Sequence, residues 1–227
     1  MLNSGENETS GRGRFRSMDM AELRESARQH WPTEPSLGLY ACPLPASVAA
    51  AGEPLTMGIP AGMVYRRGPF FCAESPESHI GPFSNAIDYL VPDGSPVYAA
   101  HSGRIIEVVE HHTTFGDGPE FRDTLNYVTI QHDIGGRQEF SQYCHLAPNS
   151  LSDRKLCVGS LVEQGQEIAT VWKTGWTDRD HLHFIVFRKD DTNKFGFRSL
   201  EVRFADILHG ATISREDKLA ASPKVGG

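Results

Sequence analysis

The sequence has no run of about 20 apolar residues, the length that a helix needs to span a membrane. Its first 30 residues are polar and lack the apolar core of about 7–15 residues that a secretory signal carries, so we expect no targeting segment there. Lysine and arginine form no cluster beyond GRGRFR near the start, and the formal net charge is −7. This composition argues against a nucleic-acid partner, because proteins that bind nucleic acid usually carry a basic patch.

Cysteine is sparse, and its spacing excludes a common kind of metal site. The four cysteines are Cys42, Cys72, Cys144 and Cys157, and no two of them form a C-x-x-C pair. A zinc site built on thiolates is therefore not expected, and free thiols are. Cys144 precedes His145, but neighbours on a strand face opposite ways, so we do not expect them to form a nucleophile pair.

The residues that are present indicate one globular domain rich in short strands. The chain is 39% hydrophobic and 22% charged, with 22 glycines and 14 prolines, which suits many turns. The expected strands are PVYAA, GRIIEVVE, NYVTIQHD, RQEFSQYCHL, EIATVW, HLHFIVFR and LEVRF. HDIGGR predicts a hairpin, because Gly135 and Gly136 tolerate positive φ. The fold class predicted is mainly β, an antiparallel sandwich or barrel-like arrangement.

The chain divides into four expected segments. Residues 1–17 should be a disordered tail, residues 18–59 an N-terminal helix and a Pro/Ala-rich wrapping segment, residues 60–210 the core domain, and residues 211–227 a flexible tail. The helix should run to Trp31 and stop before Pro32. A second short helix is expected at FADIL.

Two histidines stand on one face of an expected interior strand. Because a strand alternates faces, His181 and His183 share a side with Ile185, while Leu182 and Phe184 point the other way. Buried imidazoles need partners, since unpaired buried polar groups are costly. A metal, a catalytic arrangement or a hydrogen-bond network would each supply them.

An aspartate and two further histidines draw attention for the same reason. Asp88 lies inside the apolar run AIDYLV, where a carboxylate is expensive unless it is paired or binds a metal. His79 lies upstream of it, and His145 ends the strand SQYCHL. Catalytic zinc takes three protein ligands from His and Asp or Glu, and hydrolysis also needs groups that move protons. One aspartate and four histidines can meet both needs.

These residues, in this order, resemble the lysostaphin/LytM-type zinc metalloendopeptidases, a family of peptidoglycan hydrolases. That family shows an early His and Asp, then Y-x-H-L, then H-L-H-F, which appear here as His79, Asp88, YCHL (143–146) and HLHF (181–184). The connecting stretches AIDYLVPDGSPVYAAHSGRIIEV and CVGSLVEQGQEIATV are similar too. The resemblance covers roughly residues 60–205 and implies a β-rich core with a groove over one zinc ion.

Carried over residue by residue, the resemblance implies that His79, Asp88 and His183 bind zinc. His145 and His181 would be the catalytic histidines. The implied activity is hydrolysis of peptide bonds in peptidoglycan stem or cross-link peptides by a metal-activated water. The family acts mainly in the cell envelope or outside the cell, and the oligomeric state is left open.

The sequence departs from the family pattern at two places. Eight residues separate His79 from Asp88, where many members have three, although NAIDY fits a sub-pattern with a longer insert. The small, glycine-rich approach to H-x-H is replaced by GWTDRDHLH, which predicts a different cleft wall. We also expect the N-terminal segment to pack across the core and limit access to the zinc.

Two other functions are weighed against the peptidase. A non-catalytic cell-wall-binding or hydrolase-activating module would use the same fold, but all five positions are filled here. A phosphocarrier could use paired histidines for phosphoryl relay, but that chemistry has no need of His79 and Asp88. A purified protein without metal would favour the non-catalytic module. Phosphorylation of His181 or His183 would favour the phosphocarrier.

Overall fold

The computed structural model describes residues 20–28, 30–60, 62–205, 207–209 and 211–212. Within them the helices are α1 (Met20–Ser26) and the short 3-10 segments η1 (Ala46–Val48), η2 (Ala50–Thr56), η3 (Gly81–Phe83), η4 (Pro119–Thr124) and η5 (Ser152–Arg154). The strands are β1 (Val64–Arg67), β2 (Phe70–Ala73), β3 (Ile87–Tyr89), β4 (Pro96–Tyr98), β5 (Gly103–Val109), β6 (Phe115–Gly116), β7 (Tyr127–Ile134), β8 (Arg137–Cys144), β9 (Leu161–Val162), β10 (Glu167–Thr170), β11 (Gly175–Trp176), β12 (Leu182–Lys189), β13 (Phe197–Ser199), β14 (Ile207–Leu208) and β15 (Ala211–Thr212).

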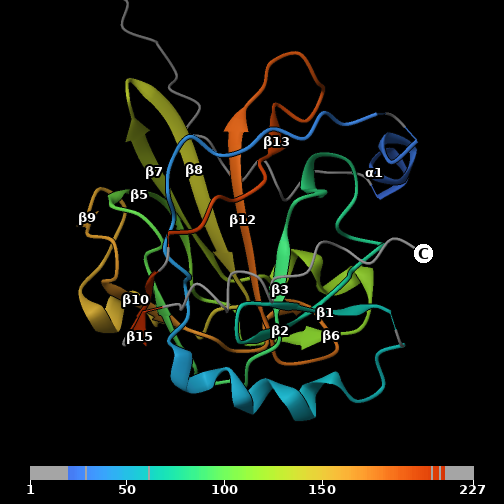
Figure 1. The fold of residues 1–227 in the computed structure, drawn as a ribbon. Helices are drawn as coiled ribbons and strands as arrows, with labels where there is room; N and C mark the ends of the chain where they lie inside the picture. The colour runs from blue at the N-terminus through green and yellow to red at the C-terminus, as the bar shows by residue number, and fades with distance from the viewer. Residues whose placement is uncertain (1–19, 29, 61, 206, 210, 213–227) are drawn as a thin grey trace, which may run out of the picture.

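One antiparallel sheet organises the molecule and confirms the mainly β, antiparallel prediction. Its order is β1-β2-β3-β12-β8-β7-β5-β9, with β13 also paired to β12. Smaller pairs, β4 with β10, β6 with β11 and β14 with β15, lie off this path. The long β7–β8 hairpin projects from the sheet in Figure 1, and Gly135 and Gly136 turn it with φ of 60° and 77°. This is the hairpin that HDIGGR predicts.

The central strand β12 separates two packed layers, as its alternation predicts. Leu182, Phe184 and Val186 point into the main core, and each is fully buried. Ile185 and Phe187 point the other way, into a smaller cluster with Leu23 of α1 and other apolar side chains. His183 lies on this second face, so the histidine side of the strand is distinct from the main core.

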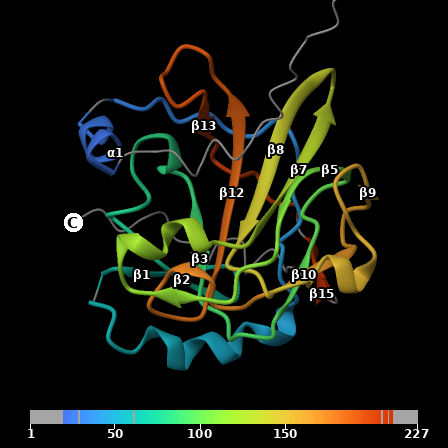
Figure 2. The same ribbon diagram turned by 180° about the vertical axis from the view of Figure 1, so that it is seen from behind.

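The N-terminal segment is part of the packed molecule. From α1 it crosses one face of the sheet and descends to η1 and η2 (Figure 1). Tyr40 and Leu44 are fully buried in the main core, and Tyr40 pairs with Phe204 in an isolated bridge. The connection from β5 to β7, which carries β6 and η4, covers the other face and lies in front when the molecule is seen from behind (Figure 2). The sheet begins at Val64, and the division of the chain into domains stays a prediction.

Three local expectations are wrong. The helix ends at Ser26 and not at Trp31, whose indole Nε1 instead donates to Ser26 O at 2.8 Å. LEVRF forms only single bridges, because its partner is an irregular segment with several prolines that lack the N–H a ladder needs. FADIL is no helix: Ala205 N donates to Tyr40 O, and Ile207–Leu208 is a strand. The expected N-terminal tail and residues 213–227 of the expected C-terminal tail lie outside the described residues, while residues 211–212 form β15.

Within the described part of the chain, no helix combines the length and the apolar character that crossing a membrane would require.

Candidate metal centre and active site

Strand pairing brings the predicted residues together from distant parts of the sequence. In the register of β12 with its two neighbours, His183 lies opposite Asp88 of β3 on one side and opposite Cys144 of β8 on the other. His79 comes from the loop between β2 and η3. Each strand thus places one group at the same end of the sheet, and the loop adds another.

His79, Asp88 and His183 form a compact donor set. The distances are 3.2 Å from His79 Nε2 to Asp88 Oδ1, 2.8 Å from His183 Nδ1 to the same oxygen, and 3.2 Å between the two nitrogens. Zinc bonds of about 2.0–2.1 Å in a tetrahedron separate neighbouring ligand atoms by about 3.3 Å. Two imidazole nitrogens and a carboxylate are also the donor types that zinc takes. This set therefore fits a zinc ion.

Asp88 is charged although it is buried. Its exposed fraction is 6%. Burial alone would raise the pKa of this carboxyl, but the attraction of His79 and His181, with hydrogen bonds from His183 and His79, holds it well below its usual range. Ser75 Oγ donates to Asp88 Oδ2 at 2.5 Å and orients the second oxygen. Asp88 therefore presents a fixed carboxylate oxygen to both metal-site histidines.

His145 stands just past the end of β8 in a left-handed conformation, with φ of 60°. Its Nδ1 lies 2.7 Å from Thr174 O, an acceptor, so Nδ1 carries the proton and Nε2 keeps its lone pair. Burial and the nearby His181 and His183 hold the pKa of His145 well below its usual range. The side chain is thus a neutral imidazole with a basic nitrogen.

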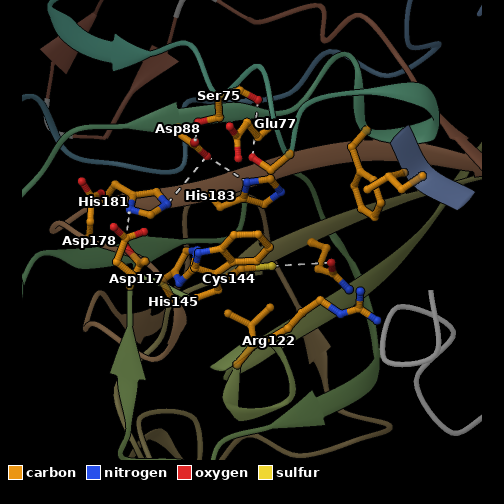
Figure 3. Close-up of a pocket in the computed structure, with 17 residues that line it drawn as sticks. Ser75, Glu77, Asp88, Asp117, Arg122, Cys144, His145, Asp178, His181 and His183 are labelled. Carbon is orange, nitrogen blue, oxygen red and sulfur yellow. Dashed lines mark hydrogen bonds and ion pairs between the residues drawn. The ribbon is translucent and has the colours of Figure 1, made fainter. Parts of the chain in front are cut away.

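His181 precedes β12 by one residue and is held in a similar way. Its Nδ1 lies 3.1 Å from Arg179 O and 3.3 Å from Thr177 Oγ1, and its Nε2 lies 3.8 Å from Asp88 Oδ1. The rings of His145 and His181 have centroids 4.3 Å apart. Figure 3 shows both histidines beside Asp88 and His183. The two imidazoles are therefore neighbours at the edge of the donor set.

These groups open on a pocket of about 340 Å³. Four of the five predicted site residues line it: Asp88, His145, His181 and His183. His79 reaches the cluster with a side chain that is only 7% exposed and is not part of this lining.

Several functional neighbours were not predicted from the sequence. Ser75 gave no signal, because a serine in a loop is common. Thr174 could not be recognised either, because the contact of its carbonyl oxygen with His145 depends on the fold. Arg122 and Asp117 come from the β5–β7 connection and line the pocket without any motif to mark them.

The expectation that Cys144 and His145 face apart is wrong. Both line the pocket, because β8 ends at Cys144 and the positive φ of His145 turns its side chain back to the same side. Burial raises the pKa of the Cys144 thiol well above its usual range, and its Sγ lies 3.5 Å from Gln142 Oε1. A protonated thiol is a poor nucleophile.

An ion cluster ties down the loops that carry both histidines. Lys173 Nζ contacts Asp93 Oδ2 at 2.5 Å and also contacts Asp180, while Asp180 Oδ2 accepts from Asp93 N at 3.0 Å. Lys173 precedes Thr174, which anchors His145, and Asp180 precedes His181. One cluster therefore fixes the approach to both imidazoles.

The N-terminal segment reaches the wall of the site at two points. Leu23 of α1 lines the pocket, and Arg179 Nη1 donates to Leu55 O in η2 at 3.4 Å. That this segment limits access to the donor set stays a prediction.

The antiparallel sheet presents a His/Asp/His donor set and two oriented imidazoles at one pocket. This combination is typical of metallohydrolases, which are therefore the candidate class. Residues 82–194 match the model of Peptidase family M23, and the chain belongs to this family. The match agrees with the resemblance in the sequence. It begins after His79, so the first member of the donor set lies outside it.

The chain is similar to several proteins that are named as peptidases. Over 141 residues the chain is 29% identical to a peptidoglycan DD-endopeptidase, ShyB, of Vibrio cholerae, which covers 62% of this chain and 27% of that protein. A zinc-containing peptidase from Vibrio cholerae, known as a crystal structure, is 30% identical over 49% of this chain and 29% of that one, with a TM-score of 0.35. The catalytic domain of lysostaphin from Staphylococcus simulans is 23% identical over 51% of this chain and 74% of that one, with a TM-score of 0.36. The chain thus spans less than a third of the length of the curated relatives that it matches.

Proposed function

We propose that this chain is a zinc-dependent endopeptidase that hydrolyses peptide bonds in peptidoglycan stem or cross-link peptides. The observation that carries the proposal is the donor set of His79, Asp88 and His183, with separations of 2.8–3.2 Å, beside two imidazoles whose Nδ1 atoms are already engaged. Membership of a peptidase family and similarity to a peptidoglycan DD-endopeptidase support the substrate class. Such a substrate places the activity in the cell envelope or outside the cell.

His79, Asp88 and His183 would hold the zinc ion, one per chain, through one atom each. Bound there, zinc supplies a Lewis acid that polarises the scissile carbonyl and makes a water molecule acidic enough to attack at neutral pH. Asp88 contributes a negative charge that stays ionised because its pKa is depressed.

His145 and His181 are the groups that move protons. Each has Nδ1 fixed on a backbone carbonyl, which leaves Nε2 for the pocket. One imidazole accepts the proton of the attacking water, and the pair delivers a proton to the leaving amine. After one imidazole takes up a proton, its N–H donates to the developing oxyanion. Fixed rings need no reorientation during the reaction.

The experiment that tests the proposal measures metal content and hydrolysis in parallel. Zinc is determined by mass spectrometry on the wild type, Asp88→Ala and His145→Ala, and peptides released from purified peptidoglycan are followed by chromatography. We expect about one zinc per wild-type chain, none in Asp88→Ala, and full zinc without hydrolysis in His145→Ala. A wild type that binds no zinc, or an active His145→Ala protein, would refute the proposal. The first of these results would favour the non-catalytic module.

A further inference from the structure

Asn126 is a fully buried asparagine whose side chain binds backbone groups of two other segments. It lies just before β7, and its exposed fraction is 0%. Its Oδ1 accepts from His112 N at 3.0 Å, and its Nδ2 donates to His112 O at 2.8 Å and to Leu146 O at 3.1 Å. An asparagine amide has two N–H donors, and here each has an acceptor. The side chain therefore joins the β5–β6 connection to the segment that follows β8.

The backbone of Asn126 closes a ring of hydrogen bonds with Leu146 and Thr174. Asn126 N donates to Thr174 Oγ1 at 3.2 Å, and Asn126 O accepts from Leu146 N at 3.4 Å. Thr174 Oγ1 in turn donates to Leu146 O at 3.3 Å. All three residues are fully buried. A buried polar network whose members are satisfied holds the segments that it connects in one arrangement.

Two members of this ring are the immediate supports of His145. Leu146 follows His145 in the chain, and Thr174 O accepts from His145 Nδ1 at 2.7 Å. The φ of His145 is 60°, a conformation that a residue with a Cβ keeps only where its surroundings impose it. Asn126 binds both the N–H and the carbonyl of Leu146, directly after the strained residue. It thus fixes the chain beside His145 and, through Thr174, the group that orients its ring.

We propose that Asn126 is a positioning residue for His145. It holds the left-handed turn and the carbonyl of Thr174 in place, so that His145 keeps its proton on Nδ1 and presents Nε2 to the pocket. The inference rests on the proposed peptidase function, in which this Nε2 moves a proton. Asn126 is not among the described residues that line the pocket, so it acts through His145 and not by contact with substrate.

The expected effect on the reaction is a loss of kcat. Asn126→Ala removes three hydrogen bonds from the buried interior, so the segment after β8 relaxes and the ring of His145 loses its fixed position. Misplacement of a catalytic group by about 1 Å can lower a rate about 100-fold. We therefore expect kcat of Asn126→Ala to fall by about 10–100-fold, with KM and zinc content close to those of the wild type.

The test measures the kinetics and the tautomer of His145 separately. Hydrolysis of peptides from purified peptidoglycan gives kcat and KM on zinc-loaded protein. Nitrogen NMR spectroscopy of the histidine rings, on the protein as purified, shows which nitrogen of His145 carries the proton. The wild type should show the proton on Nδ1, and Asn126→Ala should show a mixture of both tautomers. A wild-type kcat in Asn126→Ala, or a reduced kcat with the wild-type tautomer, would overturn the positioning role.

Asn193→Ala is the matched control, because it removes the same groups away from the site. Asn193 lies in the β12–β13 connection, beyond the end of β12 that is opposite to His183. Its side chain also makes three hydrogen bonds to the backbone: Nδ2 donates to Phe197 O at 3.1 Å, and Oδ1 accepts from Phe195 N at 2.9 Å and from Gly196 N at 3.1 Å. This variant should keep the kcat of the wild type. An equal loss of kcat in both variants would show a general destabilisation and would overturn the positioning role.

Thr174→Val decides the question where Asn126→Ala does not fold. The substitution removes only the hydroxyl that links Asn126 to Leu146, and it leaves the carbonyl that binds His145. It should lower kcat and mix the tautomers of His145, as Asn126→Ala does. A wild-type kcat or a wild-type tautomer in Thr174→Val would overturn the inference.

Failure of this inference can be told apart from failure of the proposed function. Hydrolysis by the wild type, with Asn126→Ala equally active, refutes the positioning role and leaves the peptidase. A zinc-loaded wild type that hydrolyses no peptidoglycan peptide refutes the peptidase, and the tautomer of His145 then decides alone. Mixed tautomers in Asn126→Ala but not in Asn193→Ala would support the placement of His145 by Asn126, and an unchanged tautomer would refute it.

Discussion

At the scale of single residues, each ionisable group of the site is fixed by a few hydrogen-bond partners. Asp88 has one oxygen between two histidines and the other on Ser75, so both of its oxygens are engaged. His145 and His181 each use Nδ1 on a backbone carbonyl. These contacts set the protonation and the orientation of the groups before any ligand binds, which reduces the cost of binding.

Ser75→Ala tests this outer contact. Removing the hydroxyl frees one oxygen of Asp88, so we expect zinc affinity to fall by about 10–100-fold, the range typical of such supporting hydrogen bonds. Competition with a fluorescent chelator measures it. Ser78→Ala is the matched control, because the Ser78 hydroxyl donates to the backbone oxygen of Ser75 at 3.5 Å and the substitution removes the same group. Equal zinc affinity in the Ser75→Ala protein and the wild type would contradict the assigned role.

A buried histidine outside the site, His132, should make the stability of the fold depend on pH. His132 is fully buried between Ser102 O and Ser141 Oγ, and burial lowers its pKa to about 4 from an ordinary 6.5. Below pH 6.5 the unfolded chain takes up a proton that the folded protein refuses, so stability is lost between pH 6.5 and about 4. The gap of about 2.5 pH units, at about 1.4 kcal/mol each, gives a loss of up to about 3 kcal/mol.

Urea unfolding at pH 7.5, 5.5 and 4.5 measures this loss. His132→Gln should be less stable than the wild type at pH 7.5, and the difference should shrink as the pH falls. His111→Gln, at an exposed position, should follow the wild type. A constant difference between His132→Gln and the wild type across this range would show that His132 does not titrate as expected.

At the scale of elements, two loops matter as much as the strands. The segment from Lys173 to His181 carries the anchor of His145 and leads into β12, and it is tied to the start of the β3–β4 turn through Asp93. The stretch GWTDRDHLH, which replaces the small, glycine-rich approach of the family pattern, contributes Asp180 to this ion cluster. Since its members adjoin Thr174 and His181 in the chain, we expect the cluster to act through the placement of His145 and His181.

Lys173→Met is expected to loosen both loops, because it leaves Asp93 and Asp180 close together without a cation. We expect kcat to fall by about 10–100-fold, since small displacements of catalytic groups have effects of this size, with zinc content unchanged. Lys173→Arg should recover part of kcat. Lys189→Met, at an exposed position on β12, should leave kcat as it is. A change confined to KM would mean that Lys173 contacts substrate instead.

At the scale of the whole molecule, the N-terminal segment and the sheet form one packed unit. Tyr40 contacts Glu139, a fully buried carboxylate on β8, which also accepts from the backbone of Leu37 and Gly38 and pairs with Arg188. Such a network is stable only when every member is in place, because each group lost leaves another unpaired. The segment therefore stabilises the fold as well as lining the pocket.

Leu44→Ala tests this unity. Leu44 is fully buried in the main core, so its truncation should lower the free energy of unfolding by about 2–5 kcal/mol in a single cooperative transition. Chemical denaturation followed by fluorescence and by circular dichroism measures it. Leu39→Ala is the control, because Leu39 is 51% exposed and its loss should cost less than about 0.5 kcal/mol. Two separate transitions would show that the segment unfolds independently of the sheet.

The sequence by itself determined the longer strands β5, β7, β8 and β12, the β7–β8 hairpin and the choice of candidate site residues. These are local properties: alternation along β12 places His183 on one face, and two glycines make the turn. Asp88 could be recognised because a carboxylate in an apolar run needs a partner.

Only the tertiary structure decided how these residues meet. The register of β12 with β3 places His183 opposite Asp88, and that register depends on contacts between residues 95 positions apart in the chain. The turn of His145 onto the pocket, the ion cluster at Lys173 and the hydrogen bonds around Asn126 likewise depend on loops without a periodic pattern. Long-range packing selects one conformation of such loops from many, and local sequence carries little information about that choice.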